Sequence, residues 1–234
     1  MDHRWYPVMA FHLYVSKGSL FMLESMPMLA KLRPFVCIFL KEASKMFEMY
    51  VYTMGEQFYA LEMVKVLDPR TVYFSSSVIS QADSTQRHQK GLDVVLGPKS
   101  AVLILDDTER EKLRVLLSIQ QIVGKALWLH WSSMCLWTIY LLIWAWKNHK
   151  DNLILMERYH FFASSCHQFG FHCKSVSELK SDESEPDGAL ATILKVLQQT
   201  QSTLFDPELS DNFSGRDVRQ VLNRFGGKSR RDAR

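Results

Sequence analysis

An unbroken apolar run at residues 101–105 leads directly into two aspartates, Asp106 and Asp107. A continuous apolar run is typical of a central strand in a parallel sheet, because such a strand is covered on both faces. Ligands of open α/β sheets bind beyond the carboxyl ends of the strands. Two carboxylates at that position supply oxygen ligands for Mg²⁺ beside a phosphate. The alternative is a strand-end turn with two solvated acids, and the run alone favours neither interpretation.

Other apolar segments alternate between strand and helix patterns. Strand patterns rich in β-branched and aromatic residues stand at 50–53, 72–74 and 78–79, and an apolar run similar to that at 101–105 stands at 152–156. Helical spacing of apolar residues occurs at 34–48, 56–67 and 186–204. This alternation predicts an α/β layered fold with a parallel sheet.

The composition excludes several classes of protein. A length of 234 residues suggests one domain, or a domain with additions. The net charge of +3 is too small to indicate nucleic-acid binding by itself. Four scattered cysteines do not make a disulfide framework, so we expect reduced thiols in an intracellular protein. No long apolar run follows a basic start, so we expect no secretory signal.

Two further side chains stand where a phosphate site could use them. Thr53 follows a predicted strand, and its hydroxyl could hold a phosphate oxygen, although threonines are common at strand ends. Lys90 could act as a fixed cation against phosphoryl charge. An ordinary solvated lysine is the alternative for Lys90. Neither residue indicates a function on its own.

Seven segments carry a more specific signal because they occur in a fixed order. They are residues 31–35, 49–55, 59–63, 67–69, 78–80, 105–109 and 157–162. This series resembles the catalytic domain of the RNA polymerase II C-terminal-domain (CTD) phosphatases, in particular the plant CTD phosphatase-like proteins. The resemblance implies a haloacid dehalogenase-like (Rossmann-type) parallel sheet. It also implies Mg²⁺-dependent removal of phosphate from the phosphorylated CTD of RNA polymerase II, in the nucleus and without direct nucleic-acid contact.

The resemblance also assigns roles to individual residues. In the family an Asp-x-Asp-x-Thr motif supplies the nucleophile and the general acid, and an aspartyl phosphate forms that water then cleaves. The family's threonine falls on Thr53 and its phosphate-binding lysine on Lys90. The metal-binding acids fall on Asp106 and Asp107, with Asp106 as the main contact. Arg33 matches an arginine near the substrate phosphate. Mg²⁺ would neutralise charge and orient the phosphate.

Two features depart from the family pattern before residue 110. No Asp-x-Asp-x-Thr occurs in the 234 residues, and the strand that carries it should lie upstream of Leu20. Without that motif the remaining groups can hold phosphate and metal but cannot form the aspartyl intermediate. A sheet without this central strand would be incomplete, with unpaired strand edges. In addition, Gln81 stands where the family usually has arginine, and Ala82 where an acid is common.

A third departure is an insertion. The resemblance breaks after Glu109 and resumes at Trp146, and the apolar stretch 126–146 between them contains no Asp, Glu, Lys or Arg. Its length and tryptophan content suit a transmembrane helix of ~20 residues. The alternatives are a long apolar helical insertion that is foreign to the fold, from a retained intron or a gene-model error, and a genuine membrane anchor.

Two polar clusters complete the pattern. His160, Cys166, His167, His172 and Cys173 suggest zinc, but their spacing matches no common zinc module, so we expect a packing role. The acidic segment at 181–187 is expected to be a solvated loop.

The sequence therefore divides into an unassigned 1–19, a catalytic domain at 20–205 that is interrupted by 110–145, and a C-terminal extension at 206–234 with a disordered basic end at 226–234. Three hypotheses follow for the function. They are a protein serine/threonine phosphatase, a non-catalytic remnant that binds phosphate, Mg²⁺ or a partner, and a membrane-anchored protein that uses 126–146.

Overall fold

The computed structural model describes seven stretches of the chain: residues 19–23, 28–86, 89–107, 146, 148–168, 173–206 and 216–229. The insertion at 110–145 lies outside them, and so do residues 126–145 of the apolar stretch. Among the helices of the described stretches, none has the length and apolar character needed to cross a membrane.

Strands of the described residues pair two by two. An antiparallel pair joins β1 (Leu20–Met22) and β2 (Leu29–Lys31). A parallel pair joins β3 (Val51–Tyr52) and β4 (Val78–Ile79). A second parallel pair joins β5 (Ile104–Asp106) and β6 (Leu153–Leu155). Within these residues β3 and β5 do not pair with each other, so the expected parallel sheet is present as two separate halves.

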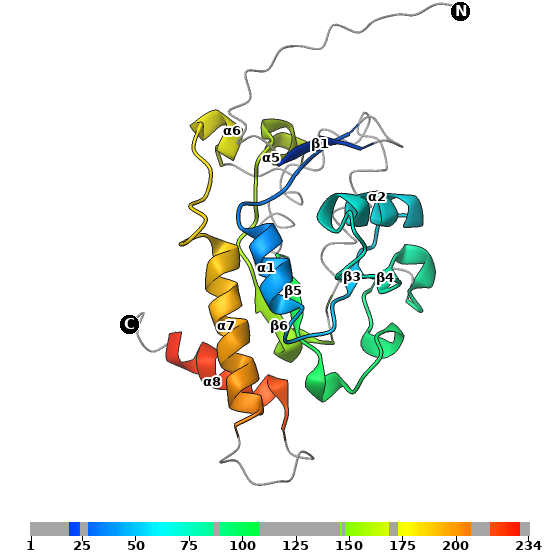
Figure 1. The fold of residues 1–234 in the computed structure, drawn as a ribbon, viewed down its shortest axis with the longest axis vertical. Helices are drawn as coiled ribbons and strands as arrows, with labels where there is room; N and C mark the ends of the chain where they lie inside the picture. Colours follow the sequence, from blue (N-terminus) through cyan, green and yellow to red (C-terminus); the bar gives the residue numbers. More distant parts are fainter. Residues whose placement is uncertain are drawn as a thin grey trace, which may run out of the picture.

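Helices surround these pairs (Figure 1). The α-helices are α1 (Val36–Ala43), α2 (Gln57–Leu67), α5 (Ala163–Gln168), α6 (Val176–Leu179), α7 (Ala189–Leu204) and α8 (Val218–Ser229). Short 3-10 turns are η1 (Gln81–Asp83), η2 (Leu92–Val94), η3 (Lys99–Ala101) and η4 (Lys150–Asn152). Helix α8 includes residues 226–229, so the expectation of a disordered end was wrong for those four positions.

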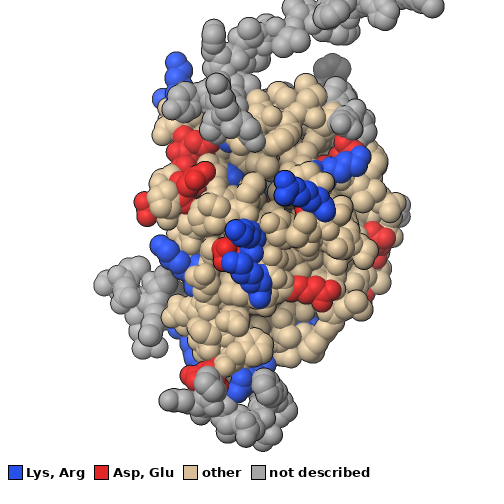
Figure 2. Space-filling view, viewed as in Figure 1, with Lys and Arg blue, Asp and Glu red and all other residues tan. Residues whose placement is uncertain are grey.

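The hydrophobic core lies where α1 and α7 cover β5 and β6. The predicted apolar face of α7 is confirmed, because Leu190, Ile193, Leu194 and Leu197 are all buried against Phe39 and Leu40 of α1. Each fully buried side chain of this size contributes about 1.5–3 kcal/mol relative to an exposed one. On the face drawn in Figure 2, basic and acidic side chains are interspersed among uncharged atoms.

Asn152 fixes the start of β5. Its buried side-chain amide donates to the carbonyl oxygens of Lys99 (2.7 Å) and Val102 (2.8 Å). A buried amide needs such partners to offset the loss of water. These two bonds tie η4, which leads into β6, to the segment that leads into β5. The amino ends of both strands are thereby held side by side.

Residues 72–74 do not form the strand that their β-branched and aromatic composition predicted. Their amides instead bond to the carboxylate of Asp68, from Val72 N to Oδ1 (2.9 Å) and from Tyr73 N (2.7 Å) and Phe74 N (3.0 Å) to Oδ2. Burial raises the pKa of Asp68, but these three donors outweigh it and hold the pKa below its usual value.

We predict that Asp68→Asn lowers the free energy of unfolding by about 1–3 kcal/mol, because an amide cannot replace both carboxylate oxygens as acceptors. Since the folded-state pKa is lowered, this contribution is present above about pH 4 and is lost as the pH falls through the folded pKa. Urea denaturation at pH 7 and pH 3 measures both effects. The exposed Asp187→Asn serves as the control, and an equal loss in both variants would contradict the prediction.

Candidate functional site

Asp106, the last residue of β5, is the centre of the polar cluster at the end of the sheet. Its Oδ2 accepts hydrogen bonds from Lys90 Nζ (3.0 Å) and Trp146 Nε1 (2.8 Å). The side chains of Lys90 and Asp106 are only 13% and 11% exposed. Charges that are shielded from water in this way interact more strongly than a surface pair. The structure therefore brings together two of the residues that the sequence had selected.

Two aromatic rings hold Lys90 in place. Its Nζ lies 5.7 Å from the ring centroid of Tyr52 and 5.2 Å from that of Trp146, and the two rings meet edge to face at 5.5 Å. The Tyr52 hydroxyl also accepts a hydrogen bond from Gly91 N (3.2 Å). Because Tyr52 belongs to β3, the loop of Lys90 is anchored to that strand. Sequence reasoning missed both rings, although Trp146 is the first residue after the insertion.

Arg158 lies beside the second acid. Its Nε donates to the backbone carbonyl of Asp107 (3.2 Å) and lies 4.0 Å from Asp107 Oδ2. Arg158 follows β6 as Asp107 follows β5, so parallel pairing puts them at the same edge. Sequence reasoning did not select this residue. The rule that ligands gather at carboxyl ends of strands would have indicated it.

Thr53 directly follows β3. Its amide donates to Ile79 O (2.9 Å), and its Oγ1 accepts from Gly55 N (3.0 Å), which closes a tight turn. A Cβ at Gly55 would lie 2.7 Å from Tyr59 Cδ1, so any other residue at this position would force the Tyr59 ring to shift. A hydroxyl that accepts one bond still carries a proton that it can donate to a phosphate oxygen.

Arg33 is buried and bound to acids of the chain itself. Its Nε donates to Glu183 Oε2 (2.8 Å), a second guanidinium nitrogen pairs with Glu183 Oε1, and a third donates to Glu157 O (2.6 Å). A bidentate carboxylate takes the geometry that a phosphate would take. Arg33 thus lies next to the residues that follow β6, and its guanidinium group is already bound to the carboxylate of Glu183.

The acidic segment at 181–187 is a loop, as expected, and five of its seven residues are exposed, but Asp182 and Glu183 are only partly exposed. Besides the Arg33–Glu183 pair, Asp182 forms an ion pair with Lys31 (3.0 Å) and accepts a hydrogen bond from the Tyr159 hydroxyl (2.8 Å). Burial and the bond to Asp182 both raise the pKa of Tyr159. Two acids of the segment neutralise two cations that lie about 150 residues earlier in the chain.

A cavity of about 530 Å³ separates β3 from β5, with Lys90, Asp106 and Trp146 among its lining residues. The amides of Val51 and Thr53 bond to β4 and the segments beside it, and Met156 N bonds to Asp106 O (3.0 Å). In a strand the peptide N–H and C=O groups of successive residues point to opposite sides. The peptide groups of Tyr52 and Leu105 therefore point away from β4 and β6 and toward the cavity. The two edges face each other where the central strand of the sheet was expected.

The donor set at this edge fits Mg²⁺. Asp106 and Asp107 offer carboxylate oxygens, the ligand type that Mg²⁺ prefers, and no thiol or imidazole is needed. When bound, the ion would neutralise phosphate charge. Lys90 shares one oxygen of Asp106 and adds a second positive charge at the same place. These residues together can hold a phosphate group and a metal ion.

Comparisons with known proteins identify related phosphatases. Residues 8–120 match a family model described as NLI interacting factor-like phosphatase. Over 208 residues the chain is 54% identical to RNA polymerase II C-terminal domain phosphatase-like 4 of Arabidopsis thaliana. The matched region spans 89% of this chain and 39% of that protein. Phosphatase-like 3 of the same plant is 34% identical over 211 residues, 87% of this chain and 14% of that protein. The chain thus spans less than half the length of these relatives.

A solved structure of Fcp1, a CTD phosphatase, resembles the fold with a TM-score of 0.55 at 20% sequence identity, over 84% of this chain and 55% of that chain. This likeness confirms the predicted haloacid dehalogenase-like α/β fold. The fold, the family model and the two plant relatives agree. The chain carries an NLI interacting factor-like phosphatase domain, similar to the corresponding part of the plant CTD phosphatase-like proteins.

Proposed function

We propose that this chain is a Mg²⁺-dependent protein serine/threonine phosphatase domain that acts on the phosphorylated CTD of RNA polymerase II, in the nucleus. The observation that carries the proposal is the partly buried pair of Asp106 and Lys90 at the carboxyl end of β5. Relatives named as CTD phosphatases support the substrate, since they match most of this chain.

Each site residue has a proposed role. Asp106 and Asp107 hold Mg²⁺, with Asp106 as the main ligand. Lys90 neutralises phosphate charge from a fixed position, and Thr53 donates its hydroxyl to a phosphate oxygen. Arg33 contacts the substrate phosphate when Glu183 gives up its place.

A second function is favoured by the sequence itself. The 234 residues contain no Asp-x-Asp-x-Thr, so the nucleophilic carboxylate of the family mechanism is not among them. A domain with Lys90, Asp106 and Asp107 but without a nucleophile would bind phosphopeptide and Mg²⁺ without turnover. The membrane hypothesis depends on 126–146, and flotation of the purified chain with lipid vesicles would test it.

We predict that Asp106→Asn abolishes any Mg²⁺-dependent hydrolysis of a small aryl phosphate, and weakens Mg²⁺-dependent binding of a CTD phosphopeptide by about 10–100-fold, because a charged ligand is lost. Hydrolysis and fluorescence anisotropy are measured on the same purified chain. The exposed Asp151→Asn serves as the matched control.

Hydrolysis by the original chain that Asp106→Asn removes would support the phosphatase. Binding without hydrolysis, again lost in Asp106→Asn, would support the non-catalytic function. If the chain neither hydrolyses nor binds in the presence of Mg²⁺, both proposals fail.

We also predict that Glu183→Gln tightens phosphopeptide binding several-fold, because the charge that competes for Arg33 is removed. The same change should lower the free energy of unfolding by about 1–3 kcal/mol, since a bond to a charged group is weakened. The exposed neighbour Glu185→Gln should change neither quantity. Unchanged affinity in Glu183→Gln would remove Arg33 from the phosphate site.

A further inference from the structure

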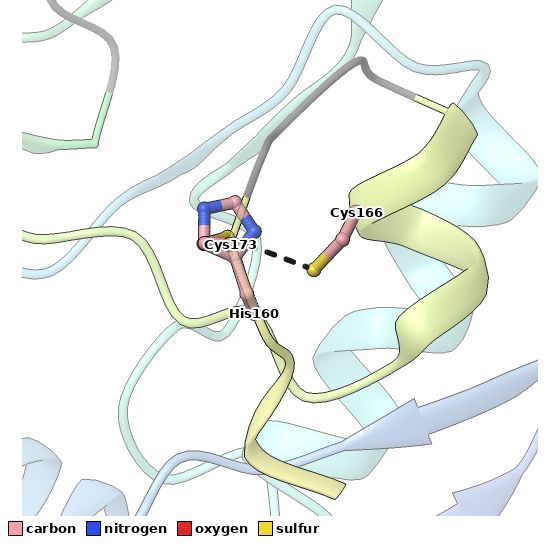
Figure 3. Close-up of side chains that lie close together, drawn as sticks. All are labelled: His160, Cys166 and Cys173. Carbon is pink, nitrogen blue, oxygen red and sulfur yellow. Dashed lines mark hydrogen bonds between the residues drawn. The ribbon is translucent and has the colours of Figure 1, made fainter. Parts of the chain in front are cut away.

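Three metal-ligating side chains converge on one point outside the acid site. His160 precedes α5, Cys166 lies within α5, and Cys173 stands shortly before α6. Figure 3 shows the three side chains pointing toward one another. Their ligand atoms all lie within 4.8 Å of each other. These residues stood out in the sequence, but their spacing matches no common zinc module, and only the structure shows that the three side chains meet.

The separations suit a shared metal ion. In a tetrahedral site with Zn–S bonds of ~2.3 Å, two sulfur ligands lie ~3.8 Å apart. The Sγ atoms of Cys173 and Cys166 are 4.0 Å apart, with Cys173 as the donor of a weak hydrogen bond. A disulfide would need ~2.05 Å. The geometry is thus close to that of two thiolates on one ion.

The backbone around the cluster is well fixed. The carbonyls of His160 and Phe161 accept hydrogen bonds from Val176 N (2.8 Å) and Ser177 N (3.1 Å) at the start of α6. Ser175 and Glu178 form a capping box there. Cys166 is buried, whereas Cys173 is exposed, so the site is reachable from water. A rigid frame of this kind lowers the ordering cost of binding an ion.

The chemistry of the ligands selects the ion. Two sulfurs and one imidazole suit Zn²⁺ or another borderline or soft cation, and they do not suit Mg²⁺. Burial is the larger cause, and the neighbouring Cys173 the second, of a raised pKa of the Cys166 thiol. A bound cation would supply the positive charge that stabilises the Cys166 thiolate. His172, next to Cys173 in the sequence, lies outside the described residues.

We propose that His160, Cys166 and Cys173 bind one Zn²⁺, with the fourth position open to water or a further ligand. The ion would join the segment after β6 to α5 and to the start of α6. Arg158 lies two residues before His160 and contacts Asp107. The zinc would therefore hold Arg158 in place beside the acid pair, as a structural and not a catalytic ion.

The test is metal binding by the purified full chain. We expect one equivalent of zinc after dialysis, and thiolate-to-metal charge-transfer absorption when Co²⁺ replaces it. Loss of a residue that only hydrogen-bonds to a metal ligand weakens metal binding by roughly 10–100-fold. Cys173→Ser removes a ligand itself, so it should weaken zinc binding by more than that. Because Cys173 is exposed, this variant should fold, which circular dichroism checks.

Matched controls separate this site from others. Cys37→Ser removes an exposed cysteine on α1 and should keep the zinc and the cobalt spectrum. Asp106→Asn should also keep them, because the acid site is separate. Zinc content that is equal in Cys173→Ser and in the original chain would overturn the proposal. Absence of zinc and cobalt binding would overturn it too, and a disulfide between the two cysteines would then be tested by mass spectrometry.

Discussion

The ion pair between Lys90 and Asp106 connects the two halves of the sheet, and the position of the site depends on it. Asp106 ends β5, while the loop of Lys90 is held to β3 through the Tyr52 hydroxyl and ring. The pair therefore bridges the cavity that separates the strands. Loss of either partner would leave a poorly hydrated charge at its edge. The same two groups present one negative and one positive charge where a metal ion and a phosphate would meet.

The cavity explains why such a bridge matters. In a complete parallel sheet a central strand would join β3 to β5 through its own hydrogen bonds. Here the peptide groups of Tyr52 and Leu105 face the cavity instead. The core of α1 and α7 covers β5 and β6 from one side, and α2 lies beside β3 and β4. The polar contacts at the carboxyl ends of the strands therefore help helix packing to hold the β3–β4 pair and the β5–β6 pair together.

The sequence predicted features that depend on local pattern. The helical face of α7 and the strand before Thr53 were correct, because periodicity and strand composition are local signals. The strand predicted for the apolar run 101–105 begins only at Ile104, because Ala101 belongs to η3. The prediction of a strand at 72–74 was wrong because the Asp68 carboxylate binds the three amides that a strand would use. No local signal could show that the acidic segment pairs with Lys31 and Arg33, since those partners lie far away in the chain. His160 and the two cysteines stood out in the sequence, but their spacing did not show that the three side chains meet.

Amide hydrogen exchange measured by NMR tests the two-halved sheet most directly. The amides of Thr53 and Met156 bond to neighbouring strands, so they should exchange slowly. The amides of Tyr52 and Leu105 face the cavity, so they should exchange much faster under the same conditions. Equal protection of all four amides would show that a strand fills the space between β3 and β5, and it would contradict the account.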